Sequence, residues 1–189
     1  KITIYQKKKL EKKWMSLVKK QNLILSNLLI ILLLNCSISQ GIEKNIFGKA
    51  KVIDGDTIII KEKKIRLYGI DAPEKKQFCK KKYLNIFFLS FKKSYPCGEE
   101  STIKLKKFLN NQSINCKIKN EKDRYNRYLA ICYKRNKDVN AWLVRNGLAV
   151  SYRKYSKKYL NQEFNAKEDK LGVWRGSFEM PWVWRKKNK

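Results

Sequence analysis

The 189-residue chain contains no histidine. Serine-protease-like triads, HExxH zinc sites and histidine-pair ribonuclease chemistry all need an imidazole near neutral pH, so the sequence excludes these mechanisms. Any hydrolytic chemistry must therefore use carboxylates, Arg, Lys, Tyr or Cys, with or without a hard cation bound by oxygen ligands.

Acidic residues are also scarce, because 16 Asp and Glu stand against 45 Lys and Arg and give a formal net charge of +29. The basic excess is spread along the whole chain, and such a surface favours a polyanionic partner. A coding bias toward Lys, Ile and Asn is the alternative source of part of this excess. The length fits one domain, and 43% apolar residues are enough to form one core.

No apolar run is long enough to span a bilayer comfortably, since that takes about 18 to 20 residues. The longest run, residues 23–34, has twelve residues and follows Lys19 and Lys20. This pattern predicts a signal peptide that is cleaved after Ser39, with an uncleaved anchor or lipid attachment at Cys36 as the alternatives.

Met15 would make a normal signal start, so residues 1–14 are interpreted as upstream sequence. Removal of residues 1–39 leaves 37 basic and 15 acidic residues, a net charge of +22. We expect residues 40–189 to be the folded domain, secreted or held in the periplasm or cell envelope. A membrane-anchored protein is the alternative.

The sequence has no CxxC pair, and four cysteines remain after the predicted cleavage. An even number in an exported domain favours disulfides over a zinc site. Cys116 and Cys132 lie at equal distances from Arg124, so a hairpin that turns there would place them opposite each other. This leaves Cys79 to pair with Cys97.

Short apolar runs predict five strands. The first three follow one another across an Asp-Gly turn and a Lys-rich turn, and the last two flank a turn near Asp123. In the third strand Ile65 and Leu67 share one face, so Arg66 points away from the core. The predicted strands are residues 48–54, 56–62, 64–70, 113–119 and 128–134.

Helical spacing of apolar residues and helix-end signals predict three helices. The first has Ile103 on its apolar face, the second is capped by Asp138, and the third has Phe164 on its buried side. The predicted helices are residues 98–109, 138–146 and 159–171.

The resulting order, β-β-β-α-β-β-α-α, is that of the OB-fold, a five-stranded Greek-key β-barrel that commonly binds nucleic acids. We therefore predict a mainly β protein with about three α-helices. Residues 80–95 fit no strand of this barrel and are predicted to form an excursion held by Cys79 and Cys97, with a short helix as an equal alternative for its centre.

The few acids concentrate at the edges of the first three strands, as Asp54, Asp56, Asp71 and Glu74. Pairing of these strands can bring Asp56 beside Asp71, and close carboxylates repel unless a cation joins them. A Ca²⁺-type site would resolve the repulsion. Turn and solvated-loop roles explain the same residues, and spacing alone favours those roles.

Four sequence blocks are distinctive: VIDGDTI (residues 52–58), RLYGIDAPE (66–74), DRYNR (123–127) and VNAWLVRNGLAVSY (139–152). They resemble the staphylococcal nuclease (thermonuclease) family, in the family's order and at compatible spacings. The similarity covers about residues 48–174. The cysteine pattern and the closing GVWRGSFEMPWVWR resemble exported bacterial members with extra cysteines.

The resemblance implies an OB-fold enzyme that uses Ca²⁺ to hydrolyse phosphodiester bonds in DNA and RNA with little sequence specificity. By the motif positions, Asp56, Asp71 and the backbone carbonyl of Ala72 would hold the metal. Glu74 would position or deprotonate the attacking water. Asp54 would be a turn residue or would support a metal ligand.

The resemblance also implies that Arg66 and Arg127 grip the scissile phosphate and stabilise its transition state. Asn126 stands where the family has a turn glycine. Since Asn tolerates positive φ, we expect Arg127 to remain aimed correctly.

Two tyrosines are candidate substrate-binding residues, because Tyr152 and Tyr155 follow the second helix and can stack on a nucleotide base. Partial burial against the barrel is the equal alternative for both. The tryptophans are expected to serve packing; these are Trp142, Trp174, Trp182 and Trp184.

We therefore expect a monomeric endonuclease whose cofactor is Ca²⁺ and whose partners are DNA and RNA, with membrane contact only through an uncleaved or lipidated N-terminus. A catalytically inactive OB-fold module that binds nucleic acid is the alternative. The acids Asp71 and Glu74 favour the enzyme, since a pure binder has no use for acids that face phosphate. A cationic membrane-surface protein fits poorly, because the basic residues are not gathered on one amphipathic helix.

Overall fold

The computed structural model describes residues 13–23, 25–27, 45–87, 89–120 and 122–188. The chain divides into two units, Lys1–Ile42 and Glu43–Lys189. Among the described residues, no helix is long and apolar enough to cross a membrane. Most of the predicted signal segment, residues 1–39, lies outside the described residues, and its cleavage after Ser39 stays a prediction.

A seven-stranded sheet forms the centre of the second unit. Its strands are β1 (Asn45–Lys49), β2 (Lys51–Val52), β3 (Thr57–Ile60), β4 (Lys63–Leu67), β8 (Ser113–Asn120), β9 (Tyr128–Lys134) and β10 (Lys137–Asp138). Along the sheet the order is β1-β8-β9-β4-β3-β2, with β10 paired to β9. Neighbours are antiparallel except β4 and β9, which are parallel and place Arg66 opposite Leu129.

The two outer strands, β1 and β2, are halves of one segment that is interrupted only at Ala50. The strand order therefore begins and ends on the same stretch of chain, as in a five-stranded Greek-key barrel in which this segment counts once. The predicted OB-fold is confirmed. Its first strand begins at Asn45 rather than at Gly48, where it was predicted to begin.

Alternate residues of β3 and β4 build the barrel core. Ile58 and Ile60 of β3, and Ile65 and Leu67 of β4, are at most 1% exposed. Burying each of these side chains stabilises the fold by about 1.5 to 3 kcal/mol. Because successive strand residues face opposite sides, Arg66 lies on the outer, partly exposed side, as predicted.

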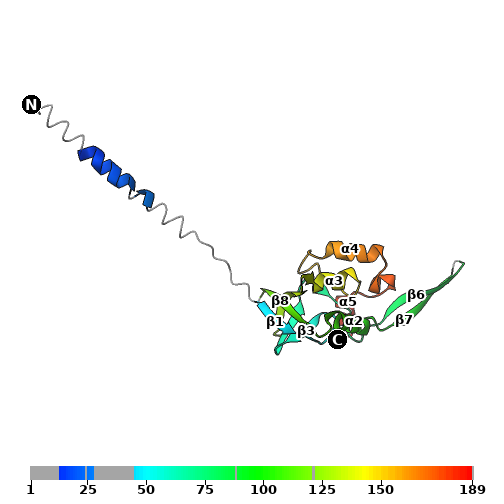
Figure 1. Cartoon of the computed structure of the whole chain (residues 1–189). Helices are drawn as coiled ribbons and strands as arrows, with labels where there is room; N and C mark the ends of the chain where they lie inside the picture. Colours follow the sequence, from blue (N-terminus) through cyan, green and yellow to red (C-terminus); the bar gives the residue numbers. More distant parts are fainter. Residues whose placement is uncertain (1–12, 24, 28–44, 88, 121, 189) are drawn as a thin grey trace, which may run out of the picture. The chain divides into compact units, whose positions relative to one another are not determined.

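Among the described residues of this unit there are also four α-helices and one 3-10 helix: α2 (Cys97–Leu109), α3 (Val139–Arg145), α4 (Leu160–Glu168), η1 (Gly172–Arg175) and α5 (Pro181–Lys187). Figure 1 shows α3 and α4 lying side by side. Asp138 caps α3, since its Oδ1 accepts a hydrogen bond from Ala141 N at 2.9 Å. The C-terminal helix α5 was not predicted.

Two side chains predicted to be buried are exposed instead, Ile103 by 45% and Phe164 by 61%. Each stands two positions before a fully buried residue, Leu105 in α2 or Ala166 in α4. Two residues along an α-helix turn about 200° around its axis, so Ile103 and Phe164 face away from the packed side. Both predictions are wrong because tertiary contacts set the packed face, which for α2 lies against β2 and for α4 against α3.

The predicted excursion is a β-hairpin, so its interpretation as a short helix is wrong. Its strands are β6 (Cys79–Ile86) and β7 (Leu89–Tyr95), and β12 (Gly176–Ser177) pairs with the base of β6. The hairpin projects from the body of this unit (Figure 1). The disulfide Cys79–Cys97 holds the two ends of the excursion together, with Cα atoms 5.5 Å apart, and antiparallel pairing follows naturally from such closure.

The second disulfide joins Cys116 to Cys132 at directly opposed positions of β8 and β9. Both predicted pairings are therefore present in the structure.

A small two-stranded sheet brings distant segments to the edge of the barrel. The strand β5 (Ile70–Asp71) pairs antiparallel with β11 (Val150–Ser151), and Asp71 lies opposite Val150. Tyr152 N then donates a hydrogen bond to Gly69 O at 2.9 Å. This pairing places Tyr152 beside Gly69, two positions before Asp71, although the sequence separates the two segments widely.

Candidate active site

Asp56 is held between its own turn and the end of β5. Asp54 Oδ1 accepts a hydrogen bond from Asp56 N at 3.0 Å, and Asp56 Oδ2 accepts one from Ala72 N at 2.8 Å. A Cβ on Gly55 would lie 2.7 Å from the Cβ of Ala72, so the turn packs directly on that residue. Asp56 is 6% exposed as a result.

Arg66 joins Asp56 to Asp71. Its Nη2 donates to Asp71 Oδ1 at 2.6 Å, and its Nη1 forms an ion pair with Asp56 Oδ1. Burial lowers the pKa of Arg66 below its ordinary value, while the charge of Asp71 opposes this. The guanidinium neutralises two carboxylates that would otherwise repel.

A tight turn orients Arg127. Asp123 Oδ1 accepts a hydrogen bond from Arg127 N at 3.0 Å, and Asp123 Oδ2 accepts one from Arg127 Nε at 2.9 Å. Asn126 has a φ of 60°, the positive-φ conformation that asparagine was expected to tolerate in place of glycine. Arg127 Nη1 donates to Thr57 Oγ1 at 3.3 Å, and Thr57 Oγ1 donates to Asp56 Oδ1 at 3.1 Å. The turn is thereby linked to the Asp56 carboxylate.

The same turn lowers the pKa of its acidic residue, Asp123. Burial alone would raise the pKa of Asp123, but the hydrogen bonds and charge of Arg127 outweigh this effect. They hold the pKa of Asp123 below its ordinary value, so the carboxylate stays ionised beside Arg127 at neutral pH.

Glu74 projects from the loop that follows β5, and Gln77 fixes this loop. Glu74 N donates to Gln77 Oε1 at 3.1 Å, and Gln77 N donates to Glu74 O at 2.7 Å. Gln77 is fully buried, and its Nε2 donates to Glu179 O at 2.6 Å. Gly98 packs on the same loop, because a Cβ there would lie 1.8 Å from Glu74 O. The carboxylate itself keeps 36% side-chain exposure.

A third arginine, Arg185 of α5, reaches the same acids. Its Nη2 donates to Asp71 Oδ2 at 2.8 Å, and its Nη1 donates to Asp71 Oδ1 at 3.1 Å and to Glu74 Oε1 at 2.7 Å. Burial lowers the pKa of Arg185, but these hydrogen bonds outweigh burial and raise it above its ordinary value.

Aromatic rings form another side of the same site. The Tyr152 ring stacks on Trp182 with centroids 5.5 Å apart and 14° between the planes, and it meets Tyr155 edge-on at 5.0 Å. Tyr68 OH donates to Tyr155 O at 2.7 Å. Tyr155 is 55% exposed, so its ring is accessible. Trp182 packs on a neighbour, as expected of the tryptophans, and it also lines the cleft.

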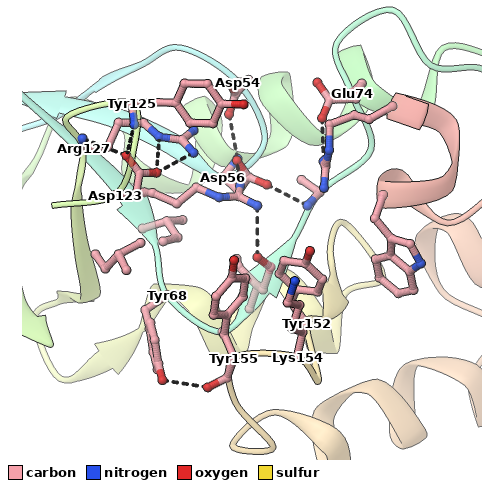
Figure 2. Close-up of a pocket in the computed structure, with 18 of the residues that line it drawn as sticks. Asp54, Asp56, Tyr68, Glu74, Asp123, Tyr125, Arg127, Tyr152, Lys154 and Tyr155 are labelled. Carbon is pink, nitrogen blue, oxygen red and sulfur yellow. Dashed lines mark hydrogen bonds and ion pairs between the residues drawn. The ribbon is translucent and has the colours of Figure 1, made fainter. Parts of the chain in front are cut away.

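These groups line or contact one cleft of about 920 Å³. Figure 2 shows Asp56 between the Arg127 turn and Glu74, with Tyr152 and Tyr155 on another side. Asp71 is fully buried and meets the cleft through Arg66 and Arg185. The structure thus brings together all the residues predicted for metal binding, catalysis and substrate binding. Those that line the cleft directly are Asp56, Arg66, Ala72, Glu74, Arg127, Tyr152 and Tyr155.

Sequence reasoning missed Arg185, Gln77 and Trp182. Arg185 lies 111 residues from Glu74, and Gln77 is 102 residues from its partner Glu179. No local pattern connects such positions. The one available signal was the closing block that contains Trp182 and Arg185, which resembles exported family members and in which only the tryptophans were given a role, that of packing.

A cation at this site would depend on few side chains. Among the residues that the structure describes, no three Asp, Glu, Cys or His side chains are grouped closely enough to hold a metal ion. Asp56 and Asp71 nevertheless converge on the one guanidinium of Arg66. Carboxylates, a backbone carbonyl and water are hard oxygen ligands that suit Ca²⁺, so this donor set fits such an ion.

The fold and the cleft define a class of protein, an OB-fold enzyme whose acids and arginines are suited to phosphate-ester chemistry. The family described as "Staphylococcal nuclease homologue" matches residues 64–176. The chain belongs to this family.

Three relatives are similar to this chain over most of its length. "Succinoglycan biosynthesis protein ExoI" of Rhizobium meliloti is 35% identical over 142 residues, 74% of this chain and 70% of that protein. An "Uncharacterized endonuclease" of Haemophilus influenzae is 30% identical over 177 residues, 89% of this chain and 88% of that protein. "Staphylococcal-like nuclease CAN1" of Arabidopsis thaliana is 30% identical over 134 residues, 69% of this chain and 36% of that protein. The family match and the endonuclease relatives identify the chain as a nuclease that hydrolyses phosphodiester bonds.

Proposed function

We propose that this nuclease is a Ca²⁺-dependent endonuclease that cuts both DNA and RNA with little sequence preference. The observation that carries the proposal is the convergence of Asp56, Asp71 and Arg66 beside Glu74 in one cleft.

Asp56, Asp71 and the Ala72 carbonyl are the groups that would hold the cation. Asp56 and Asp71 are buried and meet at Arg66, and Ala72 is bound to Asp56 through its N–H. When bound there, Ca²⁺ supplies positive charge that stabilises developing charge on a phosphate oxygen.

Glu74 is proposed as the general base. In a cleft without histidine, a carboxylate is the group that can accept a proton from water. Glu74 sits on a loop that Gln77 and Gly98 hold in place, and its side chain remains 36% exposed. A water molecule can therefore approach the carboxylate while its position stays fixed.

Arg66 and Arg127 are proposed to bind the scissile phosphate. A guanidinium offers paired N–H donors that match phosphate oxygens, and it stabilises charge that develops on them. Arg66 is oriented by Asp56 and Asp71, and Arg127 is oriented by Asp123. Both arginines line the cleft.

The substrate range follows from how nucleic acid would be held. Phosphate contacts carry no sequence information. Tyr152 and Tyr155 offer π-faces, which accept any base of either DNA or RNA. Low sequence preference is therefore the expected behaviour of this cleft.

Export of the protein as a monomer is part of the same proposal. Two disulfides suit an oxidising compartment, and the apolar run at residues 23–34 with its basic flank suits a signal peptide. The location would be outside the cell, in the periplasm or in the cell envelope.

The test is cleavage of single-stranded DNA, duplex DNA and RNA with Ca²⁺ or with a chelator, beside Glu74→Gln. We expect cutting that requires Ca²⁺, and a loss of about 100-fold or more in the variant because the proton acceptor is removed. Glu168→Gln is the matched control, since Glu168 is exposed at the end of α4 and does not line the cleft. Tight nucleic-acid binding without any cutting would contradict the proposal and favour the inactive OB-fold module.

A further inference from the structure

Arg185 is hydrogen-bonded to Asp71, one of the two carboxylates proposed to hold the cation. Asp71 Oδ1 accepts hydrogen bonds from Arg66 at 2.6 Å and from Arg185 at 3.1 Å, and Asp71 Oδ2 accepts one from Arg185 at 2.8 Å. Both oxygens of this buried carboxylate are therefore engaged by guanidinium groups. A cation bound to Asp71 would compete with these guanidinium groups for the carboxylate oxygens.

The helix that carries Arg185 is held against the cleft at two other points. Trp182, one turn earlier in α5, stacks on Tyr152. Glu179, just before α5, accepts a hydrogen bond through its carbonyl from the buried side chain of Gln77. The backbone of α5 is thus anchored independently of Arg185, and the long arginine side chain can change partners while the helix stays in place.

Charge balance decides what the new partner would be. An arginine guanidinium is not deprotonated in proteins, so Arg185 needs an anionic partner in either state. Once a divalent cation takes Asp71, the guanidinium loses its bidentate partner, and it would then face a dication. A phosphate group of nucleic acid in the same cleft offers the oxygen pair that a guanidinium binds best.

We propose that Arg185 is a third phosphate-binding residue of this nuclease, paired with Asp71 and Glu74 until a divalent cation binds and with a substrate phosphate afterwards. The inference rests on the proposed cation at Asp56 and Asp71. It assigns two measurable effects to one side chain. Arg185 competes with the cation in the free protein, and it contributes to substrate binding when the cation is saturating.

The first measurement is a calorimetric titration of the purified full chain with Ca²⁺ in the absence of nucleic acid. Arg185→Gln should bind Ca²⁺ about tenfold more tightly than the wild-type chain, because the ion no longer displaces a charge-assisted pair. Arg145→Gln is the matched control. Arg145, at the end of α3, forms an exposed ion pair with Asp169, so this variant removes the same charge away from the cleft and should leave Ca²⁺ affinity unchanged.

The second measurement is cleavage kinetics on single-stranded DNA at saturating Ca²⁺. In Arg185→Gln, kcat/KM should fall about tenfold, mainly through a higher KM, although the cation binds more tightly. Arg185→Lys keeps the charge but loses the paired N–H donors of the guanidinium. It should restore Ca²⁺ affinity to near the wild-type value while kcat/KM stays about fivefold low.

Two results would overturn the inference. An unchanged Ca²⁺ affinity in Arg185→Gln would show that no competition exists. Tighter Ca²⁺ binding with undiminished kcat/KM would show that Arg185 only obstructs the cation. If Arg185→Gln fails to fold, as judged by near-ultraviolet circular dichroism, then Arg185→Lys decides, and a wild-type kcat/KM in that variant overturns the inference.

Failure of the underlying function would look different. A wild-type chain that neither binds Ca²⁺ nor cuts DNA refutes the proposed cofactor before any variant is compared. The role of Arg185 fails only on a comparison of its variants with an active wild-type chain.

Discussion

At the scale of single residues, three arginines of the cleft are held by carboxylates. Arg66 binds Asp56 and Asp71, Arg127 binds Asp123, and Arg185 binds Asp71 and Glu74. A chain with 45 basic and 16 acidic residues thus concentrates several of its few acids around three guanidinium groups. Pre-orientation of this kind lowers the entropic cost of binding a phosphate in a fixed geometry.

Arg127→Lys tests the geometry of phosphate binding. A lysine keeps the charge but cannot hold both Asp123 and a phosphate with one rigid fork. We expect kcat/KM to fall about 100-fold, which is the scale of losing one oriented donor to a developing oxyanion. Arg135→Lys is the control, because Arg135 is exposed in the turn after β9. Equal losses in both variants would contradict a specific role for Arg127.

Gly98→Ala tests how tightly the Glu74 loop is held. The new Cβ would lie 1.8 Å from Glu74 O, so the loop or the start of α2 must move. We expect a stability loss of about 1 to 3 kcal/mol and a fall in kcat of about tenfold or more, since a displaced base loses its alignment with water. Thermal unfolding and cleavage rates measure the two effects. Wild-type kcat in a folded variant would show that the position of the loop is not critical.

At the scale of elements, the site combines Arg66 of strand β4 with residues from short connections and from the C-terminal helix. The Asp123 turn lies between β8 and β9, the Glu74 loop follows β5, and α5 comes from the C-terminus. The barrel strands fix where these connections begin. The hydrogen bonds of Asp123 and Gln77 then determine their conformation.

The Asp123 turn gives a pH dependence of defined sign. The pKa of Asp123 is held below its ordinary value of 3.8 in the folded protein, so its ion pair contributes fully above that pH. The contribution is lost as the pH falls through the lower folded-state pKa. Asp123→Asn should therefore be less stable than wild type at pH 7, by about 1 kcal/mol or less, with the difference vanishing toward pH 2. Urea unfolding at several pH values measures this, and a difference that grows in acid would contradict the assignment.

The two disulfides provide a matched pair of variants. They close loops of similar length, with sequence separations of 18 and 16, so removing either should cost about 2 to 4 kcal/mol of stability. Cys97 is adjacent to Gly98, which packs on the Glu74 loop, whereas Cys116 lies in the middle of β8. We therefore expect a larger fall in kcat when the first disulfide is removed, by Cys79→Ser with Cys97→Ser. Removing the second disulfide, by Cys116→Ser with Cys132→Ser, should lower kcat less. Equal activity in both folded variants would contradict this link.

At the scale of the whole molecule, the basic excess acts on the encounter with nucleic acid. Residues 40–189 carry a net charge of +22, and this charge is spread over strands, turns and helices. Such a surface attracts a polyanion from any direction and raises the association rate. The acids and arginines of the cleft then determine where hydrolysis takes place.

Salt dependence tests this electrostatic contribution. We expect affinity for a fluorescent single-stranded DNA, measured by anisotropy with a chelator present, to fall at least about tenfold between 50 and 200 mM salt. Release of counterions from several phosphates is the physical cause. Affinity that does not change with salt would contradict electrostatic binding, and specific contacts in the cleft would then have to account for it.

The sequence alone was sufficient for the barrel and for most of the cleft. Strand periodicity placed Ile65 and Leu67 inside and Arg66 outside, and the symmetric spacing of Cys116 and Cys132 gave their pairing. These features depend on local geometry, which a period of two or a short turn encodes directly. The four sequence blocks that resemble the nuclease family then identified the acids and arginines that the structure places in one cleft.

Tertiary structure decided which helix faces are buried, the path of residues 79–95, and the place of α5. The exposed Ile103 and Phe164 show that apolar character does not by itself select a helix face. Arg185 meets Asp71 and Glu74 only because α5 docks through Trp182 and Glu179. Contacts between residues more than a hundred positions apart depend on the packing of the whole unit, and no local pattern in the chain encodes them.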